Sequence, residues 1–191
     1  GEKTLKASRA YRGGSSYFPQ GRMLGGTSSV NAMIYSRGIK DDYDGWNVTG
    51  WKYDDVLPYF LKNEGNMKRA KGKYHNTEGP LTIDDFPNEE IIKKGILDGA
   101  RELGYDILDD MHEDVHNGFV MAQGTIKNGE RFSAAKAYLS PIKNRPNLKV
   151  IKNGLVTSLI INKNNNQVEG VNFELRGRNL KARARKEVIL S

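Results

Sequence analysis

The chain has 191 residues, of which 37% are hydrophobic and 28% are charged, a balance that is ordinary for a globular protein and too polar for a membrane span. It contains no cysteine, which excludes a disulfide scaffold, a thiolate nucleophile and a cysteine-ligated metal site within these residues. The net charge of +7 leaves nucleic acid, membrane surfaces and anionic small molecules as the partner classes to weigh.

Residues 21–33 read "GRMLGGTSSVNAM" and form the first informative stretch. Adjacent glycines let a backbone turn tightly and let another group approach it closely. Ser and Thr at the start of a helix accept hydrogen bonds from its free N–H groups. We therefore predict a helix over 29–35 whose N-terminus contacts a negatively charged group. Taken alone, the same stretch is better explained as a helix cap without any ligand.

Three further helices and a strand are predicted before residue 146. The first helix covers 54–63, with an acidic first turn and a kink at Pro58. The next element is a strand over 81–83. The second helix covers 88–103, capped by Asn88, stopped by Gly104 and carrying an apolar face of Ile91, Ile92, Ile96, Ala100 and Leu103. A shorter helix over 133–139 should end before Pro141.

After Pro146 the apolar residues alternate with polar ones, which is typical of strands. We predict strands over 148–151, 156–161, 168–175, 180–184 and 187–190, with a hairpin turn at 162–167. The basic residues near the C-terminus alternate with alanines, so we expect them to line the solvent face of a strand rather than a nucleic-acid site. The fold class is therefore α+β, with helices and loops first and antiparallel strands last.

The stretch "HEDVH" at 112–116 matches a zinc-protease pattern, in which two His one helical turn apart bind the metal. The pattern requires a helix, but Asn117-Gly118 is a strong turn signal and no apolar face precedes it. We expect a solvated acidic loop and no metal site. His75, before a turn, is expected to be a structural hydrogen-bonding residue. No nucleophile elbow, Walker loop or G-x-G-x-x-G motif occurs, so no catalytic residue is assigned.

With its continuation, "GRMLGGTSSVNAMIYSRG" resembles the first signature of the glucose–methanol–choline (GMC) family of FAD-dependent oxidoreductases. Further blocks resemble the family in the same order: "DYDGWNVTGWKYDDVLPYFLKNE", "YHNTEGPLTI" and "GFVMAQGTIKNGERFSAAKAYLSPIKNRPNLKV". The final "KEVILS" is similar to the strand that precedes the family's second signature. In detail the sequence is most similar to insect glucose dehydrogenase-like members. In "YHNTEGPLTI", Asn76 replaces the family's usual glycine.

The resemblance implies a fold, a cofactor and a reaction. The fold would be a partial GMC fold: a middle slice of an FAD-binding domain plus part of a substrate-binding domain. FAD would contact Met23, Gly25, Gly26, Thr27, Ser28, Asn31, Ala32 and Met33, with Val156 meeting the adenine end. It would be held non-covalently, because Ser29-Val30-Asn31 contains no His or Cys for a covalent link. The implied reaction oxidises a CH–OH group of a small alcohol by hydride transfer to flavin N5, with oxygen or a quinone-type compound as electron acceptor.

The resemblance also divides the chain and leaves parts of the enzyme outside it. Residues 1–64 and 133–191 would belong to the FAD-binding domain, and 65–132 to the substrate-binding domain. The family's dinucleotide fingerprint and catalytic His would lie before and after this chain, so the isolated chain is expected to be inactive. A non-catalytic basic module that binds polyanions and an inactive truncated relative are the alternatives. Asn47-Val48-Thr49 matches the N-glycosylation pattern and slightly favours secretion, although Trp46 and Trp51 suggest that it packs inward.

Overall fold

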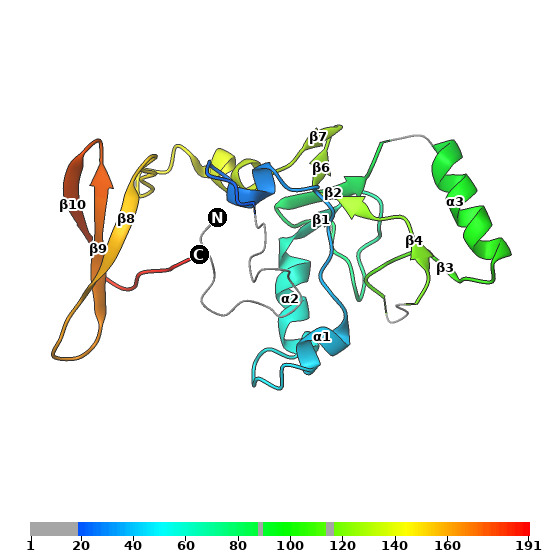
Figure 1. Cartoon of the computed structure of the whole chain (residues 1–191), viewed down its shortest axis with the longest axis horizontal. Helices are drawn as coiled ribbons and strands as arrows, with labels where there is room; N and C mark the ends of the chain where they lie inside the picture. Colours follow the sequence, from blue (N-terminus) through cyan, green and yellow to red (C-terminus); the bar gives the residue numbers. More distant parts are fainter. Residues whose placement is uncertain (1–18, 88–89, 114–116) are drawn as a thin grey trace, which may run out of the picture. The chain divides into compact units, whose positions relative to one another are not determined.

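The computed structural model describes residues 19–87, 90–113 and 117–191, and shows a mixed α/β chain (Figure 1). It forms two compact units, Gly1–Lys143 and Asn144–Ser191. The predicted division into FAD-binding and substrate-binding segments stays a prediction.

The first described element is the 3₁₀ turn η2 (Gly26–Ser29), and two helices follow it: α1 (Lys40–Asp44) and α2 (Tyr53–Asn63). The start of α2 is fixed by Asp55, whose Oδ2 accepts a hydrogen bond from the Lys52 N–H at 3.1 Å. This confirms the predicted helix, and Pro58 lies inside it without ending it. The helix passes directly into strand β1 (Glu64–Asn66), as Figure 1 shows. No helix in the described part of the chain is long and apolar enough to cross a membrane.

A three-stranded sheet in the order β1-β2-β5 lies at the centre of the first unit. Strand β2 (Leu81–Asp85) runs parallel to β1 and antiparallel to β5 (Gln123–Gly124), which confirms the strand predicted over 81–83. Ile83 on β2 is fully buried. The other fully buried large side chain among the described residues is charged, Glu64 on β1. The centre of this unit is therefore substantially polar.

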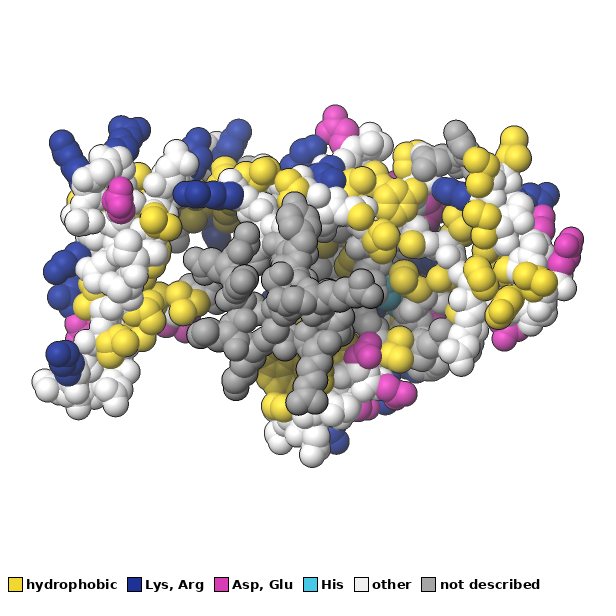
Figure 2. All heavy atoms as spheres, in the orientation of Figure 1, with side chains coloured by type: hydrophobic (Ala, Val, Ile, Leu, Met, Phe, Trp, Pro, Cys, Tyr) yellow, Lys and Arg dark blue, Asp and Glu magenta, His cyan; other side chains and the backbone are white. Residues whose placement is uncertain are grey.

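Helix α3 (Glu90–Glu102) is followed by the short parallel pair β3 (Ile107–Leu108) and β4 (Phe119–Val120). Gly104 has φ +82° and its N–H bonds to Arg101 O at 3.0 Å, so it stops the helix as predicted. The proposed cap Asn88 lies outside the described residues. The predicted apolar face is largely exposed, with Ile91 at 87% and only Ala100 buried, and yellow side chains gather over α3 in Figure 2.

A hairpin and two short helical turns complete the first unit. The hairpin joins β6 (Ile126–Lys127) to β7 (Glu130–Arg131) through Asn128 and Gly129, which have φ angles of 53° and 76° and so form the turn that hairpins favour. A π-helical turn, η3 (Ala135–Leu139), leads into the 3₁₀ turn η4 (Ser140–Ile142). The prediction that the shorter helix ends before Pro141 is confirmed, since η3 ends at Leu139 and Pro141 lies in the separate turn η4. Proline at the start of a helical turn needs no hydrogen-bonded N–H, so η4 can begin directly after η3 and include Pro141.

The second unit is an antiparallel meander of β8 (Leu155–Ile161), β9 (Val168–Leu175) and β10 (Arg178–Arg183). The turn predicted at 162–167 is confirmed by a hydrogen bond from Asn162 N–H to Gln167 O at 2.9 Å. The strands predicted at 148–151 and 187–190 are absent from the described chain, where neither segment has a ladder partner. β10 is exposed along its whole length, and Lys and Arg side chains gather over this sheet in Figure 2.

The close contact between Gly79 and the end of α2 yields a stability prediction. A Cβ at position 79 would lie 2.4 Å from Glu64 O, whereas a Cβ at Gly95 on α3 would meet no atom of the described residues within 4 Å. Gly79→Ala should therefore lower the free energy of unfolding by about 1–3 kcal/mol through overpacking. Gly95→Ala should raise it by up to about 1 kcal/mol, because alanine favours an exposed helix position. Urea unfolding of both variants checks this, and an unchanged Gly79→Ala variant would refute the contact.

Candidate cofactor-binding site

The loop at residues 21–33 is built around a single 3₁₀ turn, η2 (Gly26–Ser29), and the predicted helix over 29–35 is wrong. Asn31 Oδ1 accepts a hydrogen bond from the Met33 N–H at 3.1 Å, and Met33 adopts a φ of +66°, which no helix allows. The chain then extends, and Tyr35 N–H bonds to Gln123 O on β5 at 2.9 Å. A four-residue turn offers little helix dipole, so any anion binding here depends on the shape of the loop.

The hydroxyl groups of the loop are used within the protein. Ser28 Oγ donates to Gly25 O at 2.5 Å and accepts from the Ala134 N–H at 2.9 Å. Ser29 Oγ donates to Leu24 O at 2.9 Å. The hydroxyl proton of Ser28, one of the residues expected to contact FAD, thus stabilises the turn.

The two adjacent glycines have different surroundings. Gly25 has φ +90° and faces the protein, since a Cβ there would lie 3.2 Å from the Ala135 Cβ and 2.5 Å from Ser29 Oγ. Gly26 has φ +54°, and no atom of the described residues lies within 4 Å of the position that a Cβ would take. Met23, Thr27, Asn31 and Ala32 are exposed around it. The side of the loop at Gly26 is therefore open and has room for a bound group.

Arg131 on β7 fastens the loop and was not singled out from the sequence. Its guanidinium donates to Ser28 O at 3.1 Å, to Asn31 Oδ1 at 2.8 Å and to Asn31 O at 2.7 Å. The sequence signal that could have pointed to Arg131 is the block "GERFSAAKAYL", which resembles the family. This block does not reveal which residues the arginine contacts.

Val156, the remaining predicted cofactor residue, lies on β8 in the second unit, where it pairs with Phe173 on β9. Its side chain is 53% exposed, so it is available for contact. Its role at the adenine end of a cofactor stays a prediction.

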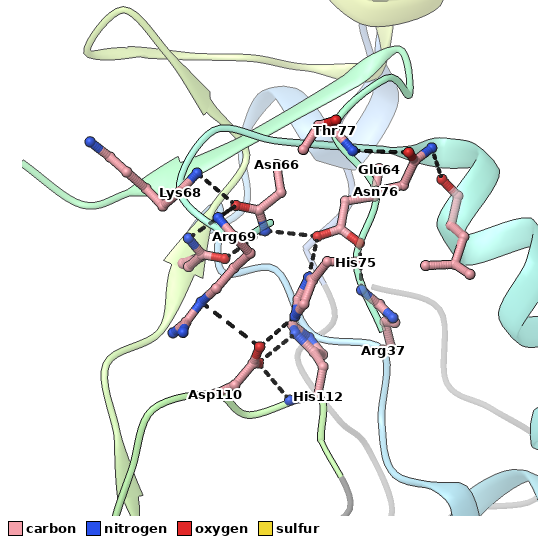
Figure 3. Close-up of polar contacts among 12 residues, drawn as sticks. Arg37, Glu64, Asn66, Lys68, Arg69, His75, Asn76, Thr77, Asp110 and His112 are labelled. Carbon is pink, nitrogen blue, oxygen red and sulfur yellow. Dashed lines mark hydrogen bonds and ion pairs between the residues drawn. The ribbon is translucent and has the colours of Figure 1, made fainter. Parts of the chain in front are cut away.

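A buried ion-pair network lies beside the central sheet (Figure 3). Glu64 accepts hydrogen bonds from Arg37 at 2.5 Å, from His75 Nδ1 at 2.8 Å and from Asn66 Nδ2 at 2.8 Å. The Arg37 and Glu64 side chains are both 0% exposed. His75 is thus the structural hydrogen-bonding residue that the sequence predicted, with partners that the sequence did not indicate.

The other ring nitrogen of His75 bonds to Asp110, and this overturns the expectation of a solvated acidic loop. Asp110 and His112 are both buried, and Asp110 Oδ1 accepts from the His112 N–H at 2.9 Å. The residues of "HEDVH" that the structure describes form no helix, while His116 lies outside the described residues. Burial of Asp110 is possible because His75 and Arg69 compensate its charge.

The network shifts the pKa values of its members together. Burial alone would lower the pKa of His75, but hydrogen bonds to Asp110 and Glu64 outweigh it and raise the pKa to about 9. Burial would raise the pKa of both carboxyls, but the pKa of Glu64 is lowered by hydrogen bonds from His75 and Asn66, and that of Asp110 by those from His112 and His75. His75 is accordingly a cation between two carboxylates at neutral pH.

The atoms that His75, Asp110 and His112 could offer to a metal ion lie within 4.8 Å of one another. However, His75 Nε2 and Asp110 Oδ2 are in direct hydrogen-bond contact. Two ligands of one zinc ion lie roughly 3 Å or more apart, because each is about 2 Å from the metal. The arrangement fits an ion pair between the His75 imidazolium and the Asp110 carboxylate better than a metal ion.

A family model described as GMC oxidoreductase matches residues 7–191. The chain belongs to this family. GMC oxidoreductases use FAD and act on alcohols.

Curated relatives agree with this assignment. The chain is 38% identical over 181 residues to "Glucose dehydrogenase [FAD, quinone]" of Drosophila melanogaster, covering 92% of this chain and 29% of that protein. It is also 38% identical over 177 residues to "Oxygen-dependent choline dehydrogenase" of Brucella anthropi, covering 91% of this chain and 31% of that protein. The resemblance to insect glucose dehydrogenase-like members is thereby confirmed.

Among solved structures, the pyridoxine 4-oxidase of Mesorbium loti matches with a TM-score of 0.76 and 27% identity, over 86% of this chain and 33% of that one. The chain therefore spans about a third of the length of the relatives that it matches.

The raised pKa of His75 predicts how the stability of this GMC chain depends on pH. The pKa is 6.5 for a free histidine and about 9 here, so the stabilisation is complete below pH 6.5 and is lost as the pH rises through 9. The shift corresponds to roughly 3 kcal/mol. Thermal unfolding should therefore show a melting temperature that falls between pH 7 and 9.5. His75→Gln should be less stable at pH 7 and lack that decline. An unaltered chain whose stability stays constant over this range would contradict the ion-pair network.

Proposed function

We propose that the loop at residues 21–33 forms the flavin-facing part of an FAD-dependent oxidoreductase that oxidises the CH–OH group of a small alcohol. When bound, FAD would accept the hydride from the alcohol carbon, and its electrons would pass to oxygen or a quinone-type compound. The relatives named for quinone and for oxygen support both acceptors. The catalytic base is assigned to no residue of this chain, and the isolated chain is proposed to be inactive.

The observation that carries the proposal is the open side of the loop at Gly26 in a member of an FAD-using family. Gly26 has no side chain, and no described atom lies within 4 Å of the position that its Cβ would take, so a flat or branched cofactor could come close to the main chain there. Met23, Gly25, Thr27, Ser28, Asn31, Ala32 and Met33 surround this point in sequence. Of these, Ser28 and Gly25 would act by shaping the turn through their mutual hydrogen bond, and the exposed Asn31 by contacting the cofactor.

The test is a visible absorption spectrum after incubation with FAD and removal of free cofactor, for the 191-residue chain and for the full-length protein. We expect the full-length protein to retain flavin and to release it on denaturation, as a non-covalent link requires.

Gly26→Ala should reduce the retained flavin several-fold, because the added methyl group occupies the open side of the loop. Gly50→Ala is the matched control: Gly50 also has a positive φ of +80° and nothing within 4 Å, but lies between α1 and α2. If Gly26→Ala and Gly50→Ala retained equal amounts of flavin, the loop would not be part of the cofactor site. A full-length protein that retains no flavin but binds polyanions in a salt-dependent way would replace the proposal with the basic binding module.

A further inference from the structure

The β6–β7 hairpin is attached to the loop at several points besides its own ladder. Thr125, just before β6, donates its N–H to Met33 O at 2.9 Å, and accepts from the Phe132 N–H at 2.8 Å. Ile126 and Arg131 face each other in the antiparallel pair. The Asn128-Gly129 turn closes the hairpin in a conformation that matches the twist of its strands. Arg131 therefore extends from a fixed backbone.

The guanidinium of Arg131 is directed at neutral acceptors. Its two terminal nitrogens reach two carbonyl oxygens and one amide oxygen of Ser28 and Asn31. None of the ion pairs among the described residues involves Arg131. A planar fork of N–H donors suits this arrangement, and the compact ammonium of lysine cannot reproduce it.

These contacts stabilise a backbone conformation that costs free energy. Met33 has φ +66°, which is unfavourable for a residue with a side chain. Asn31 Oδ1 stabilises it by accepting from the Met33 N–H, and the same oxygen accepts from Arg131. Arg131 thus fixes the Asn31 side chain in the rotamer that the turn requires.

We propose that Arg131 is a positioning residue of the cofactor site, which holds residues 28–33 in the shape that receives FAD. This inference rests on the proposed function of the loop. Arg131 acts from the side of the loop that carries Ser28 O and Asn31 O, and its effect on FAD is transmitted through Asn31 and Met33.

The test compares Arg131→Lys with the unaltered full-length protein. The substitution keeps the positive charge and removes the planar set of N–H donors. A loss of FAD affinity would therefore be due to the hydrogen-bond geometry of Arg131 and not to its charge. Arg101→Lys on α3 is the control, because Arg101 is exposed and pairs with Asp98 far along the chain from the loop. Two quantities are measured: the dissociation constant for FAD by titration, and hydrogen exchange of the amides of residues 26–33 without FAD.

We expect Arg131→Lys to bind FAD about tenfold or more weakly, since small displacements of a binding loop have large effects. Exchange at 26–33 should accelerate, while exchange in α2 stays unchanged and shows that the unit remains folded. Arg101→Lys should change neither quantity.

Equal FAD affinity in Arg131→Lys and the unaltered protein would overturn the inference. So would weaker binding without faster exchange, because Arg131 would then act by direct contact. If the unaltered protein binds no FAD, the proposed function fails and the cofactor role fails with it, whereas the exchange data still report whether Arg131 holds the loop.

Discussion

The carboxylate of Glu64 is the interaction on which the first unit depends. It accepts hydrogen bonds from Arg37, His75 and Asn66, and so joins the segment after the loop, the end of α2 and the connection between β1 and β2. His75 carries the network on to Asp110, in the connection between β3 and β4. An apolar core tolerates many arrangements of similar volume, whereas buried charges require their partners in one geometry. Removing one member leaves another charge buried without compensation.

This network is linked to the loop by a continuous set of contacts. Asn66 also donates to Gln123 on β5 at 2.8 Å, and the backbone of Gln123 accepts from the Tyr35 N–H. The next residue of β5, Gly124, forms an isolated bridge with Ile34. Thr125 follows and bonds to Met33. The position of the loop is thus fixed on one side by a strand that the buried charges hold in place, and on another by Arg131.

The elements that the sequence predicts correctly are those determined by neighbouring residues. Helix α2 has its acidic first turn, α3 has its glycine stop, and the turn at 162–167 has its asparagines. The helix over 29–35 is wrong because the Asn31 side chain competes for a backbone N–H and because β5 provides a partner for Tyr35. The strands at 148–151 and 187–190 have the alternating pattern, but a strand requires a partner, which periodicity does not reveal.

The candidate site divides in the same way. The loop itself is recognisable because glycines and hydroxyl residues occur together in 21–33. Arg131 and Asp110 are not recognisable, since their partners lie 100 and 35 residues away along the chain and no local pattern joins them. The "HEDVH" stretch shows the opposite error: the local pattern suggested exposure, but its His112 is buried and packs against the distant residues Tyr35 and His75.

The long sequence separation between the loop and its supports has a consequence for biosynthesis. The loop is made before its supports, because Thr125, Arg131 and Ala134 follow their loop partners by 92 to 106 residues. At roughly 5–20 residues per second, the ribosome needs about 5–20 s to add that length of chain. Until then the loop has its glycines but lacks these supporting contacts, so its final shape is set only after the hairpin has been made. If this loop receives the cofactor as proposed, capture of the cofactor would follow synthesis of the hairpin.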